Sequence, residues 1–425
     1  MSLGSVSPFT GTGSSDRAMF AFVWLKFLQT LHGRHPSRRR TASAPVRCGL
    51  GTFSHAPFTD ESDIGRDRRP RPRHGSAIMT TLVRRRLMAL TAVLFSGCGG
   101  AADTPSVTTP PTVAPTLSAL AITGATITKN GRPVTFAGAN ALHVYGGNSD
   151  AMPGWRVGLA REFIRNLKDQ PITGAPIYST ASKAYFHSLR SIVTDNRRNG
   201  LVTVLCPFGW DTLEVLGLNP SQQPFYAEFK ARMRAIATEF RDEPDVWLEV
   251  WNEPYWWQGG RGFSDALWLS DMQDMVDNVR VTGNRSIVLV PGGETGQSER
   301  VILTQGPALL AGRSNILFDV HAYEAWLSGA SQASIVARIA ALKAVGAAII
   351  FGETAPFNAG QQMDVRPLLS AAVAERVGVV AWLWKDDESD RSALRTAGGQ
   401  PNDADNGAWG STFRSYLQQV AALPP

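Results

Sequence analysis

From about residue 127 onwards the chain alternates short apolar runs with longer stretches of helical periodicity. Apolar residues recur every three or four positions in 225–240 and 266–281, which predicts helices there. Eight strand-then-helix units need roughly 250 residues or a little more, so the pattern predicts one α/β domain, a TIM (β/α)8 barrel, over 116–425. The eight predicted strands lie near 134–140, 157–163, 201–207, 246–252, 286–291, 316–321, 347–352 and 377–384.

A short hairpin is expected just before the first barrel strand. The step Asn130-Gly131 separates Ala-Thr-Ile-Thr from Pro-Val-Thr-Phe, and Asn-Gly is a strong signal for a two-residue hairpin turn. We expect this hairpin to close the lower mouth of the barrel.

The first 78 residues differ in composition from the rest. They are rich in Arg, Pro, Ser, Gly and His and show no sustained period, so we expect a disordered leader that packs no core. If Met79 is the true start, residues 1–78 are an upstream extension of the reading frame and not part of the protein.

Residues 79–98 have the parts of a secretory signal. A basic cluster at 84–86 precedes an apolar run over 87–95, which is too short to span a bilayer, and Ser-Gly-Cys98 follows. With Cys98 at the cleavage point the segment resembles a bacterial lipoprotein signal, and the alternative is an ordinary signal peptide with an incidental Cys. Residues 99–115, dominated by Thr, Pro and Ser, predict a flexible tether. We therefore expect an exported protein, either a cell-envelope lipoprotein held to the membrane only by its lipid or a secreted one.

Charge and cysteine content fit export. The formal net charge of +6 arises in the leader, because acidic residues outnumber basic ones beyond residue 86, and nothing indicates a nucleic-acid partner. Cys48 and Cys98 fall outside the predicted domain, so Cys206 is alone in it and can form no disulfide within the domain. We expect Cys206 to be a small buried apolar residue.

Two glutamates end apolar runs: Glu253 follows Val-Trp-Leu-Glu-Val-Trp-Asn, and Glu353 follows Ala-Ile-Ile-Phe-Gly. Acids at such places often only cap a helix or pair with an arginine. Here Asn252 precedes Glu253 and Pro254 follows it, which favours a site. Strand ends meet at one rim of a barrel, and two carboxylates held at fixed separation are what cleavage of a glycosidic bond requires.

These motifs resemble the cellulase-like glycoside hydrolase family 5, in clan A of the retaining glycosidases. The resemblance covers about 131–390 and implies that Glu253 is the acid/base, Glu353 the nucleophile and Asn252 a sugar-binding neighbour. His321-Ala322-Tyr323 is similar to the family's His-x-Tyr, which implies a site role for both residues, with Tyr323 hydrogen-bonded to the nucleophile. Trp382 is similar to the family's tryptophan that forms the floor of a sugar subsite.

Two features depart from the family pattern or match it weakly. Arg161 is the one good candidate for the family's strand 2 arginine, in a segment that could equally be helical. The family's histidine after strand 3 is missing from 201–210.

The aromatic loop 255–262 resembles a wall of the positive subsites, and we expect Trp257 to bind substrate there. We expect Glu249 to pair with an arginine in a structural role.

The predicted function is retaining hydrolysis of a β-linked polysaccharide or oligosaccharide, of the endo-β-glucanase or endo-β-mannanase type, by a monomer. No cluster has metal-ligand spacing and no phosphate loop or Gly-x-Ser-x-Gly motif is present, so no metal or cofactor is expected. The alternative is a cell-surface carbohydrate-binding protein with the same fold and little turnover. Glucan, mannan and xylan stay open as substrates, as do endo and exo action.

Overall fold

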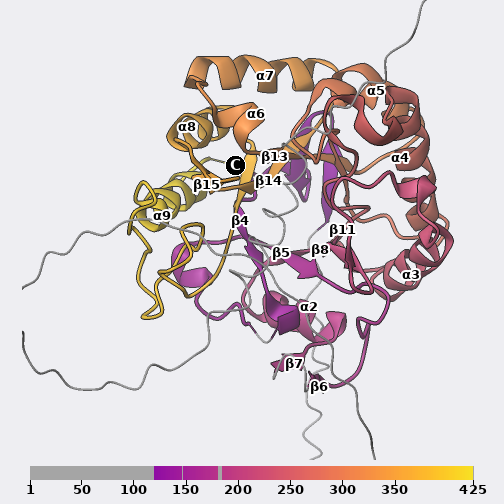
Figure 1. Ribbon diagram of the computed structural model, residues 1–425, viewed down its shortest axis with the longest axis horizontal. Coiled ribbons are helices and arrows are strands. Elements are labelled where there is room, and N and C mark those ends of the chain that lie inside the picture. The colour runs from indigo at the N-terminus through magenta and orange to yellow at the C-terminus, as the bar shows by residue number, and fades with distance from the viewer. Residues whose placement is uncertain (1–118, 146, 180–183, 425) are drawn as a thin grey trace, which may run out of the picture. The chain divides into compact units, whose positions relative to one another are not determined.

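The computed structural model describes residues 119–145, 147–179 and 184–424 (Figure 1). The predicted upstream extension, the signal segment with Cys98 and the tether lie outside the described residues. What was expected of them stays a prediction.

Eight parallel strands form a closed barrel within the described residues, in the order β11-β12-β13-β14-β17-β4-β5-β8. This confirms the predicted TIM barrel. Each predicted apolar run contains a barrel strand or most of one. The strands are β4 (Gly138–Ala141), β5 (Leu159–Ile164), β8 (Val202–Pro207), β11 (Val246–Glu249), β12 (Val288–Pro291), β13 (Ile316–Ala322), β14 (Ile349–Thr354) and β17 (Gly378–Ala381).

Helices form a ring around these strands (Figure 1). Their apolar residues pack on the outer face of the barrel, and three helices begin at a serine whose side chain accepts a hydrogen bond from the first turn: Ser188, Ser264 and Ser331. The helices are α2 (Leu189–Arg198), α3 (Tyr226–Glu239), α4 (Asp265–Arg280), α5 (Arg300–Leu310), α6 (Glu324–Leu327), α7 (Gln332–Ala344), α8 (Arg366–Glu375) and α9 (Trp409–Ala421). No helix among the described residues combines the length and the apolar character needed to cross a membrane.

A small antiparallel sheet precedes the barrel. It consists of β1 (Leu120–Thr123), β2 (Thr126–Lys129) and β3 (Arg132–Pro133), and the turn between β2 and β3 is Asn130-Gly131, with φ of 53° and 76°. Leu120 and Ile127 share one buried cluster with Leu159, Val204, Trp247 and Leu317 of the barrel strands. The predicted hairpin is therefore present and covers apolar residues inside the barrel.

Shorter elements lie in the connections. They are the 3-10 helices η1 (His143–Tyr145), η2 (Pro153–Trp155), η3 (Pro220–Gln222) and η4 (Trp257–Gly262), and the short strands β6 (Ile177–Ser179), β7 (Ala184–Phe186), β9 (Gly209–Trp210), β10 (Leu213–Glu214), β15 (Phe357–Asn358) and β16 (Gln361–Gln362). Several follow the carboxyl ends of barrel strands, which is the face where such barrels carry their sites.

The inward-facing residues change character along the strands. Near the hairpin they are apolar, as Leu159 and Leu317 are. Two residues further along the same strands stand Arg161 and Asp319, both fully buried. Alternate residues of a strand share a face, so the charged side chains form a layer directly above the apolar one.

Candidate active site

Arg161 lies at the centre of the charged layer. It belongs to β5, so the segment is a strand and not a helix. Its guanidinium donates two hydrogen bonds to Glu249, of 2.7 and 2.8 Å, and a third of 2.9 Å to Oε1 of Glu353. The expected pairing of Glu249 with an arginine is present. A bidentate bond between planar groups fixes the guanidinium, and through it the position of Glu353.

Asn252 accepts a hydrogen bond of 2.8 Å from Nη2 of Arg161 through its Oδ1 atom. Its Nδ2 group is buried and makes no hydrogen bond to any described residue. A buried amide donor without a partner is uncommon, so this group is available to a ligand.

Cys206 lies 3.6 Å from the Oδ1 atom of Asn252. It is free and buried, as expected, and its burial raises the pKa of the thiol well above the usual range. Cys206 is therefore a neutral thiol in the wall beside the amide.

Glu253 does not end a strand, and that part of the prediction is wrong. β11 stops at Glu249, and Glu253 lies in the following turn with a left-handed φ of 47°, as does Tyr255 with 62°. Left-handed backbone interrupts an extended strand. The backbone around the turn is held by hydrogen bonds from the amide of Gly217 to the Glu253 carbonyl and from the amide of Thr295 to the Pro254 carbonyl. The turn places the Glu253 side chain 2.9 Å from Nδ1 of His321.

Glu353 lies within β14 and is fully buried. Oε1 accepts from Arg161, and Oε2 accepts a hydrogen bond of 2.9 Å from the Tyr323 hydroxyl, the contact that the family resemblance implied. One carboxylate oxygen of Glu353 and one of Glu253 lie within 4.8 Å of each other. The two glutamates that the sequence paired are thus brought together.

His321 lies between the two glutamates. Its Nδ1 atom is 2.9 Å from Glu253 and 3.8 Å from Glu353. Burial lowers the pKa of His321, but the charge of Glu353 and the contacts with Asp319 and Glu253 raise it more, to about 10.

Tyr323 is buried in the same group. Burial, followed by the charges of Glu353 and Glu253, raises its pKa well above the usual range, so it remains a hydroxyl donor.

Glu253, His321 and Glu353 offer ligand atoms that lie close together, as do Glu249, Asp319 and His321. A cation at either place would need a neutral His321, because an imidazolium has two N–H donors and no lone pair to offer.

Two further residues of the site were not predicted. Asn140, at the end of β4, accepts from Arg161 at 2.7 Å and donates to the carbonyls of Gly352 and Ala381. Asp319, on β13, accepts from the amide of Gly352. The only sequence signal was their place: Asn140 ends the predicted strand 134–140, and Asp319 comes two residues before His321.

Trp382 follows β17 and is 6% exposed. Its ring meets Phe163 edge-on at 4.8 Å, and Phe163 lies 4.2 Å from Phe208, which is partly exposed. These three residues make an aromatic wall next to Arg161, whose guanidinium carbon is 5.7 Å from the Phe163 ring. Phe208 follows β8, in the stretch where the family histidine is missing.

Other tryptophans at strand ends serve packing. Trp251 and Trp326 are fully buried, and the indole N–H of each donates to a backbone carbonyl. Trp257 is partly exposed and begins η4, and its indole nitrogen is buried without a hydrogen-bond partner among the described residues. A substrate contact at Trp257 stays a prediction.

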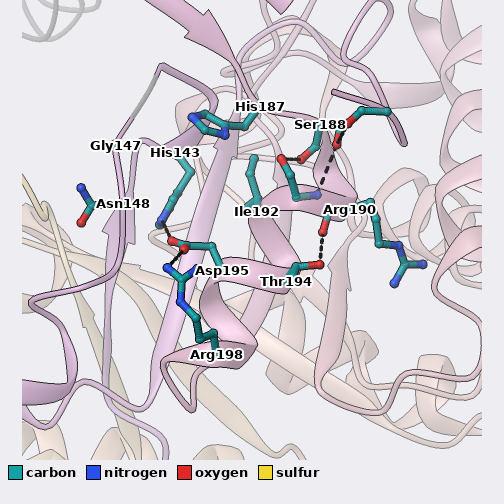
Figure 2. Close-up of a pocket in the computed structure, with 12 residues that line it drawn as sticks. His143, Gly147, Asn148, His187, Ser188, Arg190, Ile192, Thr194, Asp195 and Arg198 are labelled. Carbon is teal, nitrogen blue, oxygen red and sulfur yellow. Dashed lines mark hydrogen bonds and ion pairs between the residues drawn. The ribbon is translucent and has the colours of Figure 1, made fainter. Parts of the chain in front are cut away.

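A separate hollow of about 360 Å³ lies beside α2 (Figure 2). Several of its polar side chains already have partners: Asp195 binds His143 and Arg198, and the hydroxyls of Ser188 and Thr194 donate to backbone carbonyls. The other nitrogen of His143 is 2.7 Å from Glu162. Burial lowers the pKa of His143, but Glu162 and Asp195 raise it more, to about 10. This charged group ties the segment after β4 to α2 and to β5, the strand of Arg161.

Comparison with known proteins finds a relative of similar sequence. A curated mannan endo-1,4-beta-mannosidase of Cellvibrio japonicus is 24% identical over 208 residues, which are 48% of this chain and 46% of that protein. The chain thus spans about half the length of this relative.

Solved structures share the fold. The beta-mannanase of Streptomyces thermolilacinus with mannohexaose superposes with a TM-score of 0.55 at 16% identity, over 73% of this chain and 97% of that one. The catalytic domain of a Thermobifida fusca endoglucanase superposes with a TM-score of 0.51 at 16% identity, over 70% of this chain and 97% of that one.

The family model for cellulase, glycosyl hydrolase family 5, matches residues 165–388, a segment that contains both glutamates, His321, Tyr323 and Trp382. The match covers more than half of the chain, which therefore belongs to glycosyl hydrolase family 5.

Proposed function

We propose that this glycoside hydrolase cleaves a β-linked glycan with retention of configuration, with Glu353 as the nucleophile and Glu253 as the acid/base. One observation carries the proposal: carboxylate oxygens of Glu253 and Glu353 approach within 4.8 Å. Retaining enzymes hold their carboxyl groups about 5–5.5 Å apart, whereas inverting enzymes need about 6.5–9.5 Å to admit a water molecule between them.

The first step forms a covalent intermediate. An oxygen of Glu353 attacks the anomeric carbon, the bond from that carbon to the leaving oxygen breaks, and Glu253 gives its proton to that oxygen. Arg161 and Tyr323 donate to the two oxygens of Glu353, which orients the carboxylate for attack. Both donors are buried, and a hydrogen bond is electrostatically stronger in such surroundings than in water.

The second step releases the sugar. Glu253, now a carboxylate, takes a proton from a water molecule as the water attacks the anomeric carbon, and the bond to Glu353 breaks. The free Nδ2 donor of Asn252 is suited to the sugar 2-hydroxyl, a contact that strengthens as positive charge develops on the ring.

Mannan is the substrate that the comparisons favour. The curated relative is named a mannan endo-1,4-beta-mannosidase, and one structural neighbour is a beta-mannanase with bound mannohexaose. The endoglucanase neighbour makes β-glucan the second candidate. Measuring the release of reducing ends from soluble mannan, β-glucan and xylan side by side decides the order of substrate preference.

The stereochemical outcome tests the mechanism. The anomeric proton of the first-formed product is followed by NMR during the first minutes of hydrolysis. We expect β product first, with α product appearing only through mutarotation. Initial α product would overturn the assignment of Glu353 as nucleophile.

A carbohydrate-binding protein without turnover is the alternative. It would bind the same glycans but release no reducing ends from any of them. The charged contacts that fix both glutamates argue against it, because binding alone does not require them.

A further inference from the structure

Asp319 has no task in the mechanism above, yet it lies fully buried beneath the catalytic pair. It is on β13, two residues before His321, and both side chains face the barrel interior. Oδ1 accepts a hydrogen bond of 2.7 Å from the amide of Gly352, the residue before Glu353. A Cβ atom on Gly352 would lie 2.1 Å from this oxygen, so the carboxylate is pressed directly against the backbone of β14.

The second oxygen of Asp319 faces two nitrogen atoms. Oδ2 makes no hydrogen bond, but it lies 3.6 Å from Nε2 of His321 and 3.7 Å from Nε of Arg161. A buried carboxylate oxygen is costly unless a positive charge is close. Arg161 is bonded to Glu249 and Glu353, and His321 faces Glu253 through Nδ1, so the Nε2 atom of His321 is the nitrogen that a proton would direct at this oxygen.

Two states of His321 keep a proton on Nδ1, the ring nitrogen 2.9 Å from Glu253. Nη2 of Arg161 lies 3.5 Å from Nε2, so a neutral ring could accept from the arginine, while a charged ring would direct Nε2–H at Asp319. Nδ1–H donates to Glu253 in both states. The two states therefore differ in the charge beside Glu253 and not in the hydrogen bond to it.

The surrounding charges favour the imidazolium. Carboxylates face His321 from three elements: Glu253 and Glu249 from β11 and the turn after it, Asp319 from β13, and Glu353 from β14. Among the described residues, the guanidinium that faces it is that of Arg161 from β5, which is bonded to Glu249 and Glu353. This balance is consistent with the raised pKa of His321.

We propose that Asp319 is a positioning residue that keeps His321 positively charged, so that an imidazolium stands beside Glu253 when Glu253 releases its proton to the leaving group. A positive charge 2.9 Å from Oε1 of Glu253 stabilises the carboxylate that forms in this step. Asp319 thus supports acid catalysis through His321 while also holding the backbone next to the nucleophile. The kinetic part of this inference rests on the proposed function, whereas the charge of His321 does not.

The charge is tested directly on the full chain. Long-range ¹H–¹⁵N spectra of histidine-labelled protein distinguish an imidazolium from the neutral tautomers. We expect His321 to keep both ring protons at neutral pH in the wild type and to lose one in Asp319→Asn. Asparagine can still accept from the Gly352 amide, so the substitution removes the charge with little change of shape. A neutral His321 in the wild type would overturn the proposal even if the variant failed to fold.

Asp271→Asn is the matched control. Asp271 is also buried, but it accepts from Tyr255 and makes no contact with His321. We expect its substitution to leave the His321 signals unchanged. A loss of the imidazolium in both variants would show that any buried charge acts on His321, and it would remove the specific role of Asp319.

Kinetics test the consequence. In Asp319→Asn we expect kcat/KM on the natural glycan to fall about tenfold, which is a part of the roughly 10²–10⁴-fold that general acid catalysis contributes. We expect kcat/KM on aryl glycosides with good leaving groups to fall less. We also expect the alkaline limb of the pH profile to move to higher pH, because Glu253 releases its proton less readily without the neighbouring charge. Equal losses on both substrates would indicate damage to Glu353 and contradict the proposal.

A double-mutant cycle separates the two tasks of Asp319. The measured quantity is the dependence of kcat/KM on the leaving group. If Asp319 acts through His321, adding Asp319→Asn to a protein that already carries His321→Gln changes this dependence little. Additive changes would mean that the two residues act independently, which overturns the proposed coupling. Should the protein cleave no glycan or aryl glycoside, the proposed function fails, while the NMR measurement still decides the charge of His321.

Discussion

The Tyr323 hydroxyl donates a hydrogen bond of 2.9 Å to Oε2 of Glu353, across 30 residues of sequence. Oε1 of the same carboxylate is bound by Arg161, so each oxygen has its own donor. A carboxylate held at both oxygens cannot rotate away from the substrate, and this fixed orientation is what an attacking nucleophile requires.

Tyr323→Phe removes one of these donors and keeps the ring. A hydrogen bond to a charged group contributes about 1.5–3 kcal/mol, so we expect kcat/KM to fall roughly tenfold to a hundredfold. Steady-state kinetics measure the loss, and thermal unfolding serves as the check on folding. Unchanged kcat/KM would show that Arg161 alone orients the nucleophile.

Glu353→Gln should reduce turnover to background and leave the fold intact. Glutamine can still accept from Arg161, but its amide cannot form the glycosyl ester. Circular dichroism and a sensitive reducing-end assay make the comparison. Substantial remaining activity would mean that another group is the nucleophile.

Glu253→Ala should have a selective effect. Loss of general acid catalysis costs about 10²–10⁴-fold on natural glycans. Aryl glycosides with good leaving groups need little protonation, so their glycosylation step should survive better. The acid/base assignment predicts this contrast between the two substrate types, and the same loss on both would contradict it.

We expect the His143 cluster to make stability depend on pH. The pKa of His143 is raised to about 10, so its contribution is full below its ordinary value of 6.5 and is lost as the pH rises through about 10. The hydrogen bond from His143 lowers the pKa of Asp195, whose contribution is present above 3.8 and is lost on acidification. His321 also has a raised pKa, so His143→Gln should remove a part, and not all, of the histidine-linked loss of stability at alkaline pH. Denaturant unfolding at pH 6.5 and pH 10 measures this loss in the wild type and in His143→Gln. If the free energy of unfolding changed equally between the two pH values in both proteins, the ion pairs of His143 would be excluded as a source of the loss.

For localisation we propose export with a lipid on Cys98, a residue outside the described part of the chain. In a protein that starts at Met79, Cys98→Ala should prevent lipid attachment and move the enzyme from the detergent phase to the aqueous phase after phase partitioning. Wild-type protein that partitions wholly into the aqueous phase would instead indicate an ordinary secreted enzyme.

The sequence by itself determined the barrel and the pairing of the two glutamates. Strands buried on both faces must be apolar along their length, so each barrel strand is visible as a short apolar run such as 347–352. Parallel strands bring their carboxyl ends to one rim, so acids that follow two such runs, Glu253 and Glu353, meet there. Each of these inferences depends on a local pattern.

Only the tertiary structure decided what surrounds the pair. Arg161 contacts Glu249 across 88 residues and Glu353 across 192, and His321 contacts Glu253 across 68. Local periodicity contains no information on which of several buried charges become neighbours, so the places of Asn140 and Asp319 and the contacts of His321 could not be predicted. The early end of β11 was missed for the same reason, because the left-handed turn at Glu253 is held by Gly217 and Thr295, on segments that are distant in sequence.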